Sequence, residues 1–134
     1  MKSILVAAVT GIVRWSVGQV LTGGGIILKS DQWHLVVAEN TTEAIQQIAN
    51  PELVLVICYL DDNGQIDPVA LENRLAELKI VTPMIILAPA DKHPRLMEMI
   101  ESHQHPVIAI VIPFKPGTLV AAVNSMLSLP RIEK

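Results

Sequence analysis

Residues 53–59 read Leu-Val-Leu-Val-Ile-Cys-Tyr, an apolar run without a charged or strongly polar position. A strand with one wet face alternates apolar and polar residues, whereas a parallel strand covered by helices on both faces is apolar throughout. The run therefore predicts a strand buried on both faces. Four similar runs, almost unbroken, lie elsewhere in the chain, at residues 4–9, 33–38, 84–88 and 107–112. Together they predict five strands of a parallel sheet.

The segments between these runs carry helical patterns. Residues 41–50 begin with an Asn40/Glu43 capping-box pattern and end at Asn50-Pro51. Asp67-Pro68 supplies an N-cap and a first-turn proline for a helix over 69–78. Residues 94–102 repeat the first-turn proline, and the last helix is marked by Leu119, Ala122, Val123 and Met126. Strands and helices thus alternate along the chain.

Such an alternation, with right-handed crossovers, favours a doubly wound five-stranded parallel α/β sheet of strand order 2-1-3-4-5 with helices on both faces. The segment between the first two strands is less regular. Residues 14–21 are predicted to be helical, and Gly23-Gly24-Gly25 should break that helix.

The composition describes one compact domain. The chain has 134 residues with 51% hydrophobic and 17% charged residues, so we expect a domain over 1–128 and a tail or the start of a linker over 129–134. The net charge of −3 and the absence of a basic run argue against direct nucleic-acid or membrane binding. The single cysteine, Cys58, excludes an internal disulfide and fits a cytoplasmic location.

Three stretches resemble the response-regulator receiver family of two-component signalling, the CheY-like domains with a flavodoxin-like fold. Residues Pro51-Glu52-Leu53-Val54-Leu55-Val56 are similar to the family's third strand. Thr82-Pro83-Met84-Ile85-Ile86-Leu87 resembles its fourth strand, and Ile112-Pro113-Phe114-Lys115-Pro116 resembles its Lys-Pro-Phe turn. The stretches occur in order and at the expected spacing, and the similarity covers nearly the whole chain.

The resemblance also indicates what the chain lacks. In the family an acidic pair binds magnesium, an Asp accepts phosphate, and a hydroxyl residue and a Lys stabilise the transferred group. The positions that match these roles, in that order, are Ala8 and Val9, Ile57, Ala88 and Ile112. All five are apolar, and Ala109 stands at the family's aromatic switch position. The resemblance therefore implies a pseudo-receiver that is not phosphorylated, is not an enzyme and needs no metal or cofactor.

Two other functions stay open. Asp61 or Asp62, with Asp91, could form a displaced phosphoacceptor site at the carboxyl edge of the sheet, although Asp61-Asp62-Asn63-Gly64 is also a typical solvated turn. Alternatively, Gly23-Gly24-Gly25 could serve a small-ligand-binding α/β domain, but the spacing fits neither a dinucleotide fingerprint nor a P-loop.

A regulatory module of this kind acts through other proteins, so we expect a protein partner or an attached output domain. In the family the fourth helix, fifth strand and fifth helix form the common dimer and partner face. By resemblance, a homodimer through that face is expected here, with candidate residues Glu98, Met99, Glu101, His103 and Asn124.

Overall fold

The computed structural model describes residues 2–9, 11–23, 25–26, 31–60, 66–79, 82–89, 107–112 and 115–127. Its strands are β1 (Lys2–Ala7), β2 (Trp33–Ala38), β3 (Leu53–Tyr59), β4 (Met84–Pro89) and β5 (Val107–Ile112). Its helices are α1 (Gly11–Thr22), α2 (Thr41–Ile48), α3 (Pro68–Glu77) and α5 (Pro116–Leu127). The fourth helix expected over 94–102 lies outside the described residues.

The five strands form one sheet in the order β2-β1-β3-β4-β5, and every neighbouring pair is parallel. The predicted fold class and strand order are confirmed. The first strand was placed two residues too late, because Lys2 and Ser3 pair with Trp33 and His34 of β2. Polar residues at a strand start are invisible to a pattern that searches for apolar runs.

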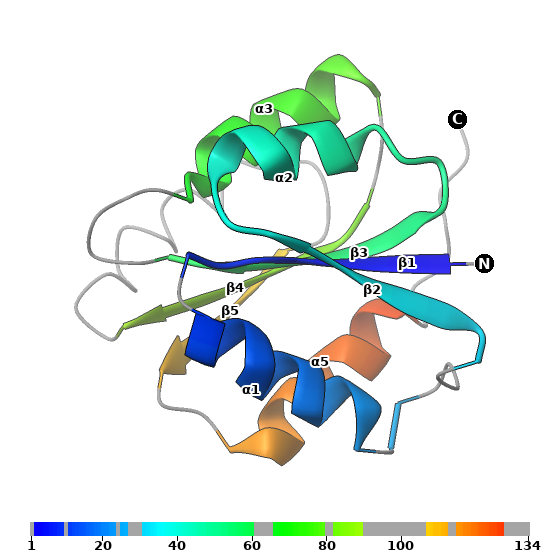
Figure 1. Ribbon diagram of the computed structural model, residues 1–134, viewed down its shortest axis with the longest axis vertical. Coiled ribbons are helices and arrows are strands. Elements are labelled where there is room, and N and C mark those ends of the chain that lie inside the picture. The colour runs from blue at the N-terminus through cyan, green and yellow to red at the C-terminus, as the bar shows by residue number, and fades with distance from the viewer. Residues whose placement is uncertain are drawn as a thin grey trace.

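Helices cover both faces of the sheet, α2 and α3 on one face and α1 and α5 on the other (Figure 1). Each face has its own apolar core. The α2–α3 cluster contains Leu5, Ala7, Ala38, Ala44, Ile48, Leu53, Val56, Cys58, Ile66, Leu71, Leu75, Met84, Ile86 and Ala88. The α1–α5 cluster contains Ile4, Val6, Val17, Leu21, Trp33, Val54, Leu55, Ile57, Ile85, Leu87, Ile110, Leu119, Val123 and Met126. Burial on both faces explains why the strand sequences are apolar throughout.

The N-terminus of α2 is capped as the sequence predicts. The Asn40 side chain accepts a hydrogen bond from the Glu43 backbone N–H at 2.9 Å. The Glu43 carboxylate reaches back and accepts from the Glu39 N–H at 2.8 Å, one residue before the expected position. At the other end α2 stops at Ile48, earlier than predicted, and the Asn50 side chain accepts from the Glu52 N–H to form the turn into β3.

The first helix is longer than predicted, and a glycine fixes the segment after it. Gly25 has a φ of +85°, and a Cβ there would lie 3.3 Å from the Val120 side chain of α5. Glycine is therefore required for both conformation and space. The Asn124 side chain of α5 donates a hydrogen bond to the Gly25 carbonyl. The expected glycine break after α1 is confirmed at Gly23 and Gly25, while Gly24 lies outside the described residues.

Among the helices that the structure describes, none has the length and apolar character needed to cross a membrane.

Candidate functional site

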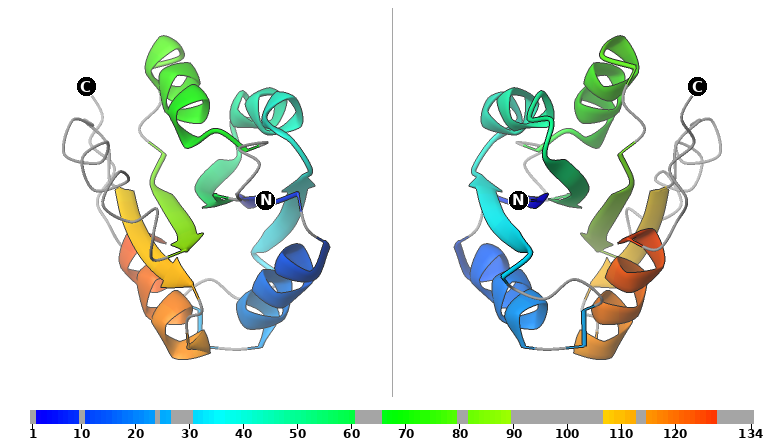
Figure 2. Two further views of the ribbon diagram at one scale, coloured as in Figure 1. Left: turned by 90° about the vertical axis from the view of Figure 1, so that its left-hand side faces the viewer. Right: turned by 90° about the vertical axis from the view of Figure 1, so that its right-hand side faces the viewer.

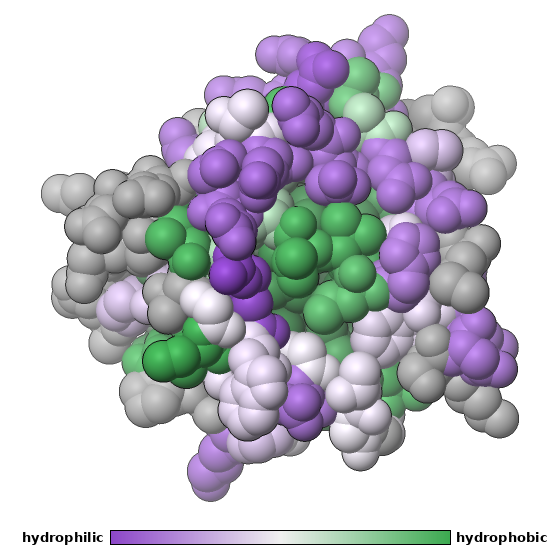
Figure 3. Space-filling view, in the orientation of Figure 1, coloured by the Kyte–Doolittle hydropathy of each residue, from purple (hydrophilic) through white to green (hydrophobic). Residues whose placement is uncertain are grey.

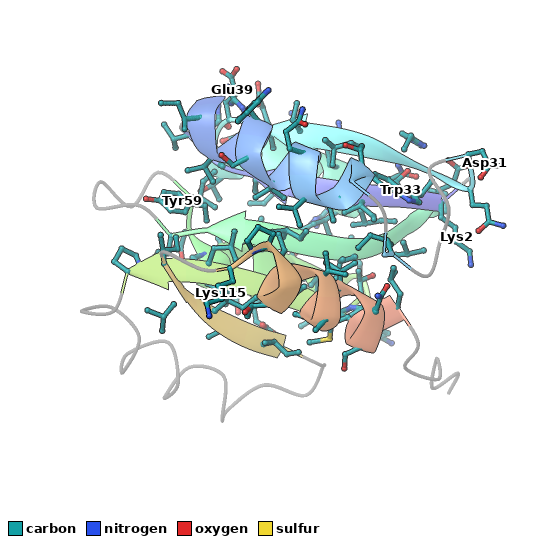
Figure 4. The ribbon with its side chains drawn as sticks, turned by 90° about the horizontal axis from the view of Figure 1, so that it is seen from below. Lys2, Asp31, Trp33, Glu39, Tyr59 and Lys115 are labelled. Carbon is teal, nitrogen blue, oxygen red and sulfur yellow. The ribbon has the colours of Figure 1, made fainter. Side chains whose placement is uncertain are left out.

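The carboxyl ends of parallel strands meet at one edge of a sheet, which is where ligands bind in open α/β folds. Figure 2 (left) looks onto this edge, between the two pairs of helices. Glu39, Tyr59 and Lys115 lie at this end, and Lys2, Asp31 and Trp33 lie at the opposite end (Figure 4). We therefore looked for the positions matched to receiver chemistry at the end of the sheet marked by Glu39, Tyr59 and Lys115.

Three of the five matched positions are fully buried. Ala8, Ile57 and Ala88 each expose 0% of their surface, whereas Val9 and Ile112 are half-buried. All five lie on the carboxyl-terminal half of the sheet, but at different depths. Ile57 pairs with Val6 and Ile85, two and three residues before Ala8 and Ala88 along their strands. Pro89 pairs with Ile112, so the last matched position lies at the rim of the sheet.

Four of the five side chains are assigned to the two faces of the sheet, two to each face. Ile57 belongs to the α1–α5 cluster, and Ile112 packs against it. Ala88 belongs to the α2–α3 cluster, and Val9 packs against that one. The structure thus brings the positions to one end of the molecule but does not collect them into a single pocket. These four contribute to two cores, and an ion beside any of them would meet aliphatic groups.

A cation, rather than a pair of acids, lies beside the end of β1. The Arg14 guanidinium of α1 donates a hydrogen bond to the Ala8 carbonyl at 3.2 Å. The same nitrogen lies 3.3 Å from a Glu39 carboxylate oxygen. Arginine stays protonated and has no lone pair to offer a metal ion, so this group repels a divalent cation at the spot where the acidic pair is missing.

The Arg14 side chain is about one-fifth exposed and the Glu39 side chain about two-thirds exposed. Arg14 is therefore the more buried partner of this ion pair. Through Arg14, the Ala8 carbonyl after β1 is connected to Glu39 after β2, and the Glu39 carboxylate is engaged with this cation.

Solved structures with the same arrangement of strands and helices are receiver domains. The signal receiver domain of an HD domain-containing protein from Pseudomonas fluorescens Pf-5 superposes with a TM-score of 0.74 at 21% identity, covering 94% of each chain. The non-phosphorylated HemR receiver domain from Leptospira biflexa gives 0.73 at 16% identity, covering 100% of each chain. This chain has the receiver fold.

Full-length FixJ from B. japonicum gives a TM-score of 0.74 at 16% identity, covering 94% of this chain and 57% of FixJ. The receiver fold here thus corresponds to little more than half of that longer chain. No protein-family model and no curated protein matches the sequence itself.

The displaced acidic site that the sequence left open falls on segments that the structure does not describe. Asp61, Asp62 and Asp91 lie outside the described residues. Within the described ranges, no group of three or more His, Cys, Asp or Glu side chains is arranged to hold a metal ion.

The predicted partner face is described only in part. Glu98, Met99, Glu101 and His103 lie outside the described residues. Asn124 lies on α5 and is half-buried, and its amide holds the Gly25 carbonyl, so this side chain has a structural contact within the domain. On β5, Ala109 is half-buried beside Ile86, at the position of the receiver's aromatic switch.

Sequence reasoning missed Arg14 as a residue of this end. A signal was present, because Arg14 is the only basic residue between Lys2 and Lys29, and it lies in the first turn of the helix that follows the first strand. We searched the sequence for acidic residues at the positions matched to receiver chemistry, and Arg14 is a basic residue that reaches the same end of β1 from helix α1.

Proposed function

We propose that this chain is a regulatory module with a receiver scaffold that is not phosphorylated and that acts by binding a protein partner or an attached output domain. One observation carries the proposal. Ile57, the residue at the phosphoacceptor position, is fully buried in the α1–α5 cluster. An aliphatic side chain offers no nucleophile, and its burial leaves no room for a phosphoryl group to approach.

The other matched positions support the same conclusion. Ala8, Val9 and Ala88, which the resemblance matches to the metal-binding and hydroxyl positions, have aliphatic side chains that cannot bind an ion. Burying a charge without a partner costs several kcal/mol, and the nearby Arg14 adds repulsion against the metal. Phosphate-driven switching would therefore be strongly unfavourable at this end.

The proposed output is interaction with other proteins. We infer a cytoplasmic module in two-component-type signalling, with the domain over 1–128 and residues 129–134 as a tail or the start of a linker. Full-length FixJ, of which the matching part is 57% of the chain, illustrates this fold within a longer protein. The fourth helix, β5 and α5 would form a partner or dimer face, with candidate residues Glu98, Met99, Glu101, His103 and Asn124.

Incubation with magnesium and acetyl phosphate, followed by intact-mass measurement, tests the proposal. We expect no added phosphoryl group under conditions that modify an ordinary receiver domain used as a positive control. A stoichiometric adduct would contradict the proposal. If that adduct disappeared in the Asp61→Asn, Asp62→Asn double variant, the displaced-acceptor function would replace it.

A further inference from the structure

Strand β2 forms one edge of the sheet, and its own residues lack the features that usually protect an edge. Its six residues, Trp33-His34-Leu35-Val36-Val37-Ala38, include no Asp, Glu, Lys, Arg, Pro or Gly. All six pair in register with β1, so no bulge twists the strand away from a potential partner. Sheet edges are normally protected by charges, prolines, bulges or covering segments, because an open edge is a template for another strand.

The backbone of β2 directs specific groups outward. The Ala38 carbonyl accepts from the Ala8 N–H at 3.0 Å, and the Gln32 carbonyl accepts from the Lys2 N–H at 3.3 Å. The backbone N–H and C=O groups of the even-numbered residues of β2 therefore point toward β1. Because peptide groups alternate along a strand, Leu35 and Val37 direct their N–H and C=O groups away from β1.

Apolar side chains accompany this open backbone. Val37 is 50% exposed, and the nearby helix α1 presents Trp15 at 66% and Ile12 at 74% exposure. These are three of the four large hydrophobic residues that are exposed in the described part of the chain. Figure 3, which views the molecule from the β2 side, shows apolar side chains gathered in the middle of this face.

Helix α1 runs beside β2 on the face toward which Leu35 and Val37 point. A Cβ added to Gly18 would lie 3.5 Å from the Leu35 side chain, and Arg14 contacts Glu39, the residue after β2. Leu35 packs against the α1–α5 cluster, and the alternation of side chains puts Val37 on the same face. The exposed residues of α1 and β2 thus border one edge of the domain.

We propose that β2 pairs with β2 of a second copy of this chain, antiparallel about a two-fold axis, to form one continuous ten-stranded sheet. A two-fold axis normal to the sheet keeps both copies of α1 on the same face, beside the joined strands. The exposed Trp15 and Val37 of each copy would then lie next to the new joint. An extended peptide would satisfy the strand but bring no helix to cover Trp15, which favours a folded second copy.

Charge selects the register of this pairing. In an antiparallel pair, the side chains of residues directly opposite each other point to the same face of the sheet. If most of β2 is to pair with its copy, the two-fold axis must pass through a central residue, either Leu35 or Val36. An axis at Leu35 would place the exposed acids Asp31 and Glu39 opposite each other, twice. Like charges in opposed positions are destabilising. An axis at Val36 pairs Leu35 with Val37 and avoids the repulsion, so we assign the axis to Val36.

The dimer is tested by light scattering during size-exclusion chromatography over a wide range of concentrations. We expect a concentration-dependent dimer for the native chain. Val37→Lys should weaken it at least about tenfold, because a buried ammonium opposite Leu35 has no partner. The matched control is Val111→Lys, which alters a valine on β5 at the other edge that is 39% exposed.

The control variant also separates this dimer from the one proposed through the fourth helix, β5 and α5. Dissociation by Val37→Lys with retention of the dimer in Val111→Lys supports pairing through β2. A monomeric native chain at all concentrations, or weakening by Val111→Lys to the same or a greater extent, would overturn it. Circular dichroism of each variant checks that the fold is retained.

A cysteine at the axis tests the register. In a non-hydrogen-bonded antiparallel pair the Cα atoms lie about 4.5 Å apart, within the range that a disulfide spans. Val36→Cys should therefore form a disulfide-linked dimer under mild oxidation. The native chain should not, because Cys58 is fully buried. His34→Cys, which would lie opposite Ala38, should cross-link poorly; a dimer in which Val36→Cys fails to cross-link would overturn the assigned register.

Discussion

At the amino end of the sheet a fully buried hydroxyl has two side-chain neighbours, whereas the receiver positions at the carboxyl end carry only aliphatic groups. The Ser3 Oγ lies 3.0 Å from His34 Nε2 and accepts from the Asn50 amide at 3.4 Å. This network connects β1 to β2 and to the turn before β3. Ala8, Ile57 and Ala88 at the other end are buried without any such partner chemistry.

The difference is informative because open α/β folds bind ligands at the carboxyl end. Here the buried polar network lies at the end that normally has a structural role, whereas the matched positions at the usual ligand end carry aliphatic side chains. A polar network fixes strand register because each unsatisfied group would be costly. At the carboxyl end, Ile57 and Ala88 are instead part of the two apolar cores.

The largest expected effect comes from restoring an acid at the phosphoacceptor position. Ile57→Asp would bury a carboxylate in the α1–α5 cluster without a partner and should lower the free energy of unfolding by about 3–5 kcal/mol. Denaturant unfolding monitored by circular dichroism measures this change. Ile57→Val, the control, should cost only about 0.5–1.5 kcal/mol. If Ile57→Asp lowered the free energy of unfolding only slightly, water would have to reach the side chain at position 57 more easily than the packing indicates.

The next largest expected effect is a pH dependence of stability caused by the buried carboxyl group of Glu72. Glu72 of α3 is 8% exposed, and burial raises its pKa from 4.5 to about 7. The folded chain therefore holds a proton that the unfolded chain releases, and stability falls as the pH rises through this range. We expect a loss of about 1–3 kcal/mol in the free energy of unfolding from pH 4.5 to above pH 7.

Glu72→Gln removes this proton equilibrium and should be more stable than the native chain above pH 7, by about the same amount. Unfolding curves across the pH range measure both proteins. Glu77→Gln on the same helix breaks an exposed ion pair with Arg74 and should change stability by no more than about 0.5 kcal/mol. If the two variants showed the same pH profile, burial of Glu72 would not be the cause of the pH dependence.

The smallest expected effect is at the amino end. Ser3→Ala removes the hydroxyl between His34 and Asn50 and should lower the free energy of unfolding by about 1–2 kcal/mol. Ser16→Ala on the half-buried side of α1 is the control and should be neutral or slightly stabilising, because alanine is the better helix former. Equal effects at both serines would remove the distinction between the two ends of the sheet.

The fold could be predicted from the sequence because the decisive signals are local. Continuous apolar runs such as residues 53–59 identify buried strands, and Asn40 with Glu43 identifies a helix start. Strand boundaries were less predictable, because Ser3 is buried through partners distant in sequence. The site was predictable only as a set of matched positions. Their division between two faces and the approach of Arg14 depend on strand pairing and helix placement.

The most direct test of the central claim is a titration of the isotope-labelled chain, first with magnesium alone and then with beryllofluoride, followed by amide spectra. Beryllofluoride mimics a bound phosphoryl group only where an acceptor carboxylate and a metal site exist together. An apolar carboxyl end predicts that the amide signals of Ala8, Ile57 and Ala88 do not move at either step. Saturable shifts of these signals that require both magnesium and beryllofluoride would contradict the claim.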